Sequence, residues 1–71
     1  MPPRNSEQGE WFAEFVLPHE PMLRAWLLNR FGRQLTIDDI IQESYVRVWQ
    51  AKLEGELRSP KAFLYATARN V

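Results

Sequence analysis

The sequence contains no cysteine and only one histidine, His19, and both shortages restrict its chemistry. Without cysteine the chain cannot form disulfides, thiolate metal sites or a cysteine nucleophile, which fits a reducing cytoplasm. One histidine cannot build a histidine-based metal cluster, and no nucleophile is near it in the sequence. Asp38 and Asp39 are adjacent, but neighbouring residues on a helix point about 100° apart and cannot share a proton or a metal. We therefore expect neither an enzyme nor a bound cofactor.

The chain also lacks an excess of charge and any long apolar run. Nine basic and nine acidic residues give a formal net charge of zero, so overall charge does not favour a nucleic-acid partner. Residues 57–71 nevertheless hold three cations and no acid, and a local basic end can meet phosphate in a neutral chain. No apolar run approaches the roughly 18 residues that span a bilayer, so no membrane partner is expected. Residues 1–6 lack the apolar core of a signal peptide and are expected to form a flexible tail.

Aromatic residues are frequent in this short chain. Three Trp, four Phe and two Tyr among 71 residues favour one small domain with a well-filled core. Apolar residues recur at helical spacing, and no segment alternates long enough to make a strand. The expected fold is all-α, a compact bundle of three to four helices over residues 7–71. No helix-termination signal precedes Val71, so the chain is expected to be a fragment of a longer protein.

Proline, glycine and hydroxyl residues predict where the helices begin and end. The helices are expected at residues 7–17, 18–31, 36–53 and from 59 onward, with Gly32 and Gly55 ending the second and third. Thr36 is expected to cap the third helix, with Asp38 and Asp39 in its first turn, where carboxylates complement the helix dipole. Ser59 followed by Pro60 predicts the cap and first position of the fourth helix.

The third helix divides into an apolar stripe and a polar strip. The stripe is expected to face the core and consists of Ile37, Ile40, Ile41, Tyr45, Val48, Trp49 and Leu53. What we call the outward strip consists of Asp39, Gln42, Glu43, Val46, Arg47 and Gln50. A solvated helix face would account for this strip, whereas the apolar Val46 within it favours contact with a protein. Spacing alone leaves both interpretations open.

The fourth helix also has two faces. Lys61, Tyr65 and Arg69 follow one another at four-residue steps and place an aromatic ring between two cations. Cations bind phosphate and the ring can stack on an exposed base, and Arg58 and Ser59 add donors in the preceding loop. Long cationic side chains around a half-buried tyrosine would explain the same spacing without a ligand.

Two motifs stand in order along these two helices. They are Asp39-Ile40-Ile41-Gln42-Glu43-x-Tyr45-x-Arg47-x-Trp49 and Ser59-Pro60-Lys61-Ala62-Phe63-Leu64-Tyr65-x-x-Ala68-Arg69-Asn70. In this order and at this spacing they resemble region two of bacterial RNA polymerase sigma factors, most of all the extracytoplasmic-function group. The resemblance implies that the helix like residues 37–53 docks on the clamp coiled coil of the polymerase largest subunit. Gln42 and Glu43 match the family motif for that contact.

The same resemblance implies a role in promoter recognition. The loop like residues 52–59 and the helix after it would recognise the minus-ten element as a single strand with a flipped base. Arg58, Ser59, Lys61, Tyr65 and Arg69 would take that role. Ser59 stands where the family often has Asn, and Phe63 where it often has Trp, so base preference does not transfer. The resemblance further implies core RNA polymerase and promoter DNA as partners, with an anti-sigma factor as an additional one.

Two other functions compete with this interpretation. A helix-turn-helix DNA-binding domain needs a turn of about three or four residues between its last helices, and the connection at residues 52–59 looks too long. A helical protein-interaction module without a DNA role would not bind single-stranded promoter DNA.

Overall fold

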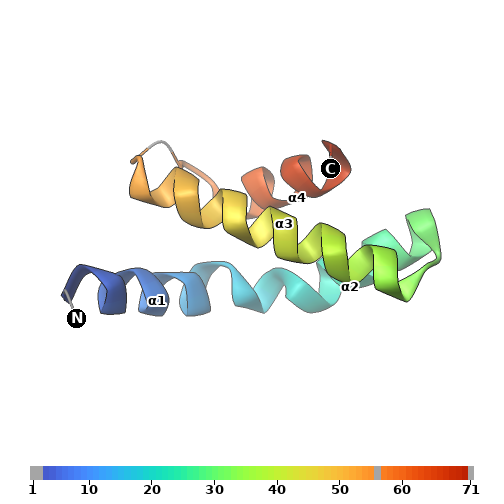
Figure 1. Cartoon of the computed structure of the whole chain (residues 1–71), viewed down its shortest axis with the longest axis horizontal. Coiled ribbons are helices and arrows are strands. Elements are labelled where there is room, and N and C mark those ends of the chain that lie inside the picture. The colour runs from blue at the N-terminus through green and yellow to red at the C-terminus, as the bar shows by residue number, and fades with distance from the viewer. Residues whose placement is uncertain (1–2, 56, 71) are drawn as a thin grey trace.

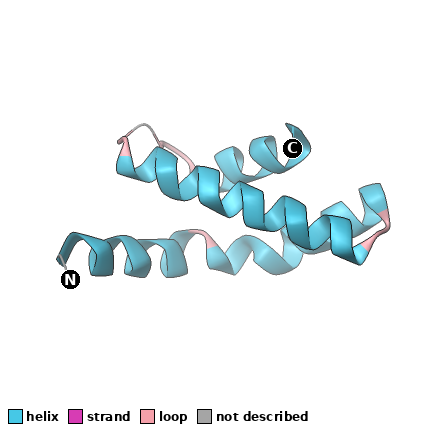
Figure 2. Ribbon diagram, in the orientation of Figure 1, coloured by secondary structure: helices cyan, strands magenta, loops and turns pink. Residues whose placement is uncertain are grey.

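Helices make up nearly all of the chain. The computed structural model describes residues 3–55 and 57–70, and the side chains of these residues apart from 3–6, 34 and 35. The helices are α1 (Pro3–Phe15), α2 (Glu20–Phe31), α3 (Gln34–Leu53) and α4 (Pro60–Asn70), with a short 3-10 helix, η1 (Leu17–His19), between the first two. No strand occurs in residues 3–55 or 57–70, and the all-α prediction is confirmed (Figure 2).

The chain bends once between α1 and α2 and then reverses its direction twice, before α3 and before α4. Figure 1 shows α1, η1 and α2 following one another along one side of the molecule, and α3 running back along them. The chain then reverses again into α4, which packs on α3. The bend at η1 has a local cause, because Pro18 and Pro21 each lack an amide donor and stand in the first turns of η1 and α2, where no donor is needed.

Two helices begin earlier than the sequence predicted. α1 begins at Pro3 rather than at Glu7, so residues 3–6 are helical, whereas residues 1–2 lie outside the described part. α3 begins at Gln34 with Arg33 in an extended conformation as its N-cap, so the assignment of the cap to Thr36 is wrong. The first turn of α3 contains no acid, and the prediction that Asp38 and Asp39 complement the helix dipole is therefore also wrong.

The predicted boundary between the first two helices is also displaced, because α1 ends at Phe15 and α2 begins at Glu20, with η1 between them. The ends of α2 and α3 and the start of α4 are confirmed. Gly32 and Gly55 both have a φ of 75°, the left-handed conformation that glycine adopts most readily, and they follow α2 and α3 respectively. At the start of α4, the Ser59 side-chain oxygen accepts a hydrogen bond from the Ala62 amide at 3.3 Å. Ser59 thus caps a helix that has Pro60 in its first position.

The core lies along α3, which packs between α2 and α4. The fully or almost fully buried apolar residues are Val16, Leu23, Leu27, Ile37, Ile40, Ile41, Val48, Ala51, Leu64 and Ala68. Ser44 is also completely buried, and it fits there because its hydroxyl donates to the Ile40 carbonyl at 2.7 Å. Within the predicted apolar stripe, Tyr45 and Trp49 are only half-buried and Leu53 is 55% exposed. The stripe prediction is therefore wrong at Leu53, beyond the last buried residues of the helix.

A polar network joins α2 to the first half of α3. Arg24 donates to Asp38 Oδ1 at 2.6 Å and to Glu20 Oε2 at 3.3 Å. The other Glu20 oxygen accepts from the Tyr45 hydroxyl at 2.7 Å. Asp38 and Glu20 together raise the pKa of Arg24 above its ordinary value, with the hydrogen bond that Arg24 donates to Asp38 as the main cause. Asp38 thus forms a tertiary ion pair with Arg24 of another helix.

We expect this network to be visible in the titration of Tyr45. Burial, and then the hydrogen bond to Glu20, raise the pKa of Tyr45 above its ordinary value of about 10. The resulting stabilisation is present below about pH 10 and is lost as the pH rises through the folded-state pKa. Glu20→Gln should lower the midpoint of phenolate absorbance without restoring the ordinary value, because burial is the larger cause. The absorbance change that is lost in Tyr45→Phe identifies the part of the titration that comes from Tyr45. Circular dichroism checks that the helices persist at high pH. An unchanged midpoint in Glu20→Gln would contradict the contact.

Candidate binding surfaces

The outward strip on α3 is exposed over its whole length. Each of its six side chains, Asp39, Gln42, Glu43, Val46, Arg47 and Gln50, is exposed. The four-residue repeat separates them into two rows along the helix, listed here as Asp39, Glu43 and Arg47 in one and Gln42, Val46 and Gln50 in the other. Arg47 Nε donates to Glu43 Oε2 at 3.0 Å, an exposed pair that leaves both side chains half open to solvent. The strip thus has a charged row and a row of amides around an apolar residue.

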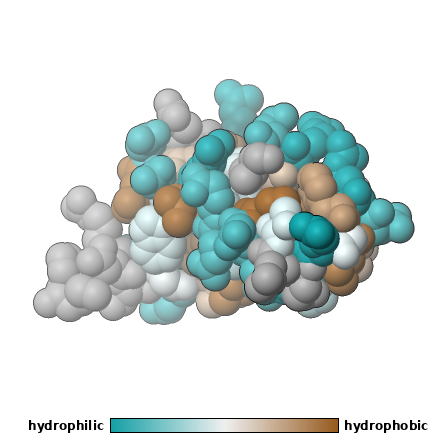
Figure 3. All heavy atoms as spheres, turned by 45° about the vertical axis from the view of Figure 1, so that its right-hand side comes forward, coloured by the Kyte–Doolittle hydropathy of each residue, from teal (hydrophilic) through white to brown (hydrophobic). Residues whose placement is uncertain are grey.

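Apolar surface accompanies this strip. A core built from few helices leaves large hydrophobic side chains exposed, including Val46 at 49% and Phe31 at 42%. Figure 3 shows hydrophobic side chains interspersed among hydrophilic ones on the visible face. Such side chains are normal when scattered, and they indicate a contact surface only where they gather in a groove.

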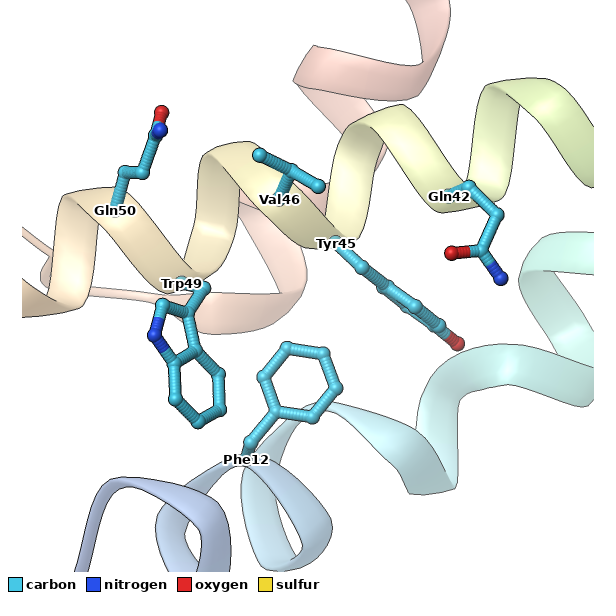
Figure 4. A pocket seen from close by; sticks show the side chains of 6 residues that line it. All are labelled: Phe12, Gln42, Tyr45, Val46, Trp49 and Gln50. Carbon is cyan, nitrogen blue, oxygen red and sulfur yellow. The ribbon is translucent and has the colours of Figure 1, made fainter. Parts of the chain in front are cut away.

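The amide row borders a groove between α1 and α3. This groove, of about 350 Å³, is lined by Phe12, Gln42, Tyr45, Val46, Trp49 and Gln50. Figure 4 shows Tyr45 and Trp49 pointing from α3 toward Phe12 on α1, with Gln42 and Gln50 at opposite ends. The Phe12 ring meets Tyr45 edge-on at 5.1 Å between centroids and Trp49 at 5.6 Å. The groove therefore has an aromatic floor and an amide at each end.

Two contacts hold α1 against the second half of α3. Gln8 is buried and donates from Nε2 to the Trp49 carbonyl at 3.1 Å. The Lys52 ammonium lies 4.9 Å from the centre of the Trp11 ring, a cation–π distance. Trp49 was expected to be largely buried, but it is half-buried and forms one wall of the groove. The sequence pattern did not predict the contribution of Phe12, because Phe12 reaches the groove from another helix.

The charged row borders a second concavity, on the side of α4. Its volume is about 690 Å³, and its lining consists of Phe31, Thr36, Asp39, Ile40, Glu43, Arg47 and Asn70. The ends of α2 and α4 meet the first half of α3 here. Each row of the outward strip thus has its own hollow beside it.

The residues predicted to bind DNA lie on α4 and in the loop before it. Arg58, Ser59, Lys61 and Arg69 are exposed, and Ser59 also serves as the helix cap. Within the chain that the structure describes, no ion pair involves Arg58, Lys61 or Arg69, so these cations remain available to an anion from outside.

Tyr65 is half-buried rather than fully outward. Its ring packs against Trp26 of α2, with 5.4 Å between centroids and 64° between planes. The Arg30 guanidinium lies over the other ring of this pair, 5.4 Å from the Trp26 centroid. The structure thus places two residues of α2 beside the row of Lys61, Tyr65 and Arg69 that the sequence predicted on α4. The sequence pattern predicted neither residue, because a contact between two helices leaves no signal in the spacing of one helix.

Several other kinds of site find no support in the described residues. No group of three or more His, Cys, Asp or Glu side chains in that part could hold a metal ion. Among the helices described, none is both long and apolar enough to cross a membrane. The connection between α3 and α4 covers residues 54–59, which is longer than the turn of about three or four residues in a helix-turn-helix motif.

Comparison with known proteins places the chain in a family. Residues 15–71 match the family model described as Sigma-70 region 2. The chain is also similar to the ferric citrate uptake sigma factor FecI of Escherichia coli (strain K12), with 30% identity over 53 residues. That match covers 75% of this chain and 31% of the relative, so the chain spans about a third of the relative's length. No solved structure was found to match.

Proposed function

This chain belongs to the sigma-70 region 2 family and is a sigma factor domain, and from that premise we propose that it docks on core RNA polymerase and binds the minus-ten promoter element as a single strand. The observation that carries the proposal is the exposure of all six strip residues on α3, the helix that also supplies half of the buried apolar residues of the core. The role is non-enzymatic and would place the protein in the cytoplasm with the polymerase. An anti-sigma factor that covers the strip would compete with the polymerase for it.

Polymerase docking is assigned to α3 and its groove. A coiled coil buries its apolar seam and presents long polar and charged side chains beside it. Their methylene stems can cover the aromatic floor of the groove, and their polar ends can meet Gln42 and Gln50. Glu43 and Arg47 in the charged row can pair with charges on the partner, because their own pair is exposed and therefore weak. Asp39 extends this row toward the start of the helix.

Binding of the single strand is assigned to α4 and its preceding loop. Arg58, Lys61 and Arg69 supply positive charge and form no ion pair within the described chain, and Ser59 adds a hydroxyl at the helix start. The exposed part of Tyr65 can stack on an unpaired base. Unstacking costs least on a strand that is already open, so the surface should prefer single-stranded DNA to duplex.

Docking can be tested with Gln42→Ala/Glu43→Ala. Both side chains are exposed, so the free energy of unfolding should change by only about 0.5 kcal/mol. Core polymerase binding, measured by fluorescence anisotropy of the labelled chain, should weaken at least about fivefold, or ~1 kcal/mol.

The matched control is Glu14→Ala/Asn29→Ala, which also removes one carboxylate and one amide from exposed helical positions, but outside the strip. This control should bind like wild type. Equal affinity of the strip variant and wild type would contradict the docking assignment. Melting curves for both variants exclude loss of structure as the cause.

A further inference from the structure

Three side chains form a continuous contact from α2 to α4. The Arg30 guanidinium lies 5.4 Å from the Trp26 ring centre, and Trp26 lies 5.4 Å from Tyr65, centroid to centroid. Arg30 is exposed, whereas the two rings are half-buried against the core. Arg30 and Trp26 are one helical turn apart on α2, so the cation is held at the surface over the ring that packs against Tyr65 of α4.

The two segments that meet here carry positive charge only. All nine acids of the sequence lie outside residues 21–33 and 57–71. Glu20, at the start of α2, is engaged by Arg24 and Tyr45 on the side facing α3. Arg30, like Lys61 and Arg69, forms no ion pair within the described chain. The face shared by α2 and α4 therefore complements a polyanion, although the whole chain is neutral.

We infer that a single strand of DNA held on α4 continues onto α2, where Arg30 binds its backbone phosphate. Trp26 is a positioning residue in this arrangement, because it holds the Arg30 guanidinium by a cation–π contact and supports the Tyr65 ring. Phosphate suits a guanidinium better than an ammonium, since two parallel N–H groups can bind two oxygens. The inference rests on the proposed DNA-binding function and extends its footprint by a second helix.

The test is a nuclear magnetic resonance titration of the 71-residue chain with a single-stranded minus-ten oligonucleotide, a method that detects weak binding. The three indole N–H signals act as local reporters. The signal of Trp26 should shift together with the α4 amides, whereas those of Trp11 and Trp49, which lie on the α1–α3 side, should not. Arg30→Ala should weaken binding about three- to tenfold. The slope of log affinity against log salt concentration should become shallower by about 0.7, the value for one phosphate contact on a single strand.

The matched control is Arg47→Ala, which changes the net charge equally from an exposed site on the outward strip. It should leave the affinity within a factor of about two. If Arg30→Ala also binds like wild type while Lys61→Ala binds weakly, the inference fails and the proposed DNA function stands. If the oligonucleotide shifts no α4 amide in the wild-type chain, both fail. Equal shifts with polyglutamate of the same charge would show binding of any polyanion and would also overturn the inference.

Discussion

Replacing Leu64 with alanine should remove most of the stability of this domain. Leu64 is fully buried on α4 within the core cluster, so its truncation loses apolar contact and leaves a cavity. Such substitutions cost about 2–5 kcal/mol, and a single core in a chain of this size supplies only about 3–5 kcal/mol. The variant is expected to be largely unfolded, or to melt far below wild type, in urea and thermal denaturation followed by circular dichroism.

Leu53→Ala is the matched control for Leu64→Ala. The chemical change is the same, but the Leu53 side chain is 55% exposed at the end of α3, and its loss should cost at most about 1 kcal/mol. Equal losses in the two variants would mean that Leu53 packs as the sequence pattern predicted. No loss in Leu64→Ala would mean that α4 is not part of the cooperative core.

The exposure of Leu53 shows what helical periodicity can and cannot predict. A repeat of apolar residues identifies the side of a helix that faces its neighbours, and this prediction was right for Ile37, Ile41 and Val48. It does not say how far the neighbouring helices extend. α3 is the longest helix and continues past its last buried residue, Ala51, so Leu53 extends the repeat into solvent.

The start of α3 could not be predicted locally for a different reason. Asp38 and Asp39 near a helix start favour a dipole contact, but the helix begins at Gln34 and Asp38 pairs with Arg24 on another helix. An ion pair between residues that are distant in the sequence leaves no local pattern. Tertiary contact therefore decided the role of this carboxylate.

The two proposed binding surfaces also differ in how much of each the sequence could predict. The outward strip followed from one helix, because exposure at three- and four-residue steps depends only on the period. Its grooves could not be foreseen, since Phe12 and Asn70 reach them from other helices. The contact between Trp26 and Tyr65 also joins two helices, and it changes Tyr65 from an isolated ring into part of a larger surface.

Charge reversal at Lys61 or Arg58 should have the largest effect on function. Both side chains are exposed, so Lys61→Glu and Arg58→Glu should change the free energy of unfolding by only about 0.5 kcal/mol. Each variant replaces an attraction to phosphate with a repulsion, and promoter opening by reconstituted holoenzyme should slow at least about tenfold. Opening is measured with a fluorescent base in the minus-ten element.

The concentration dependence of opening then separates the two proposed surfaces. A weak docking surface is compensated by excess protein, because mass action restores the holoenzyme, so Gln42→Ala/Glu43→Ala should recover as its concentration rises. Lys61→Glu and Arg58→Glu act after docking, and their defect should persist when the polymerase is saturated. Their binding to core polymerase, measured by anisotropy, should equal that of wild type. If both variants open promoters normally, α4 and its preceding loop do not hold DNA. If both instead recover with excess protein, these cations belong to the polymerase contact and the division between α3 and α4 is wrong.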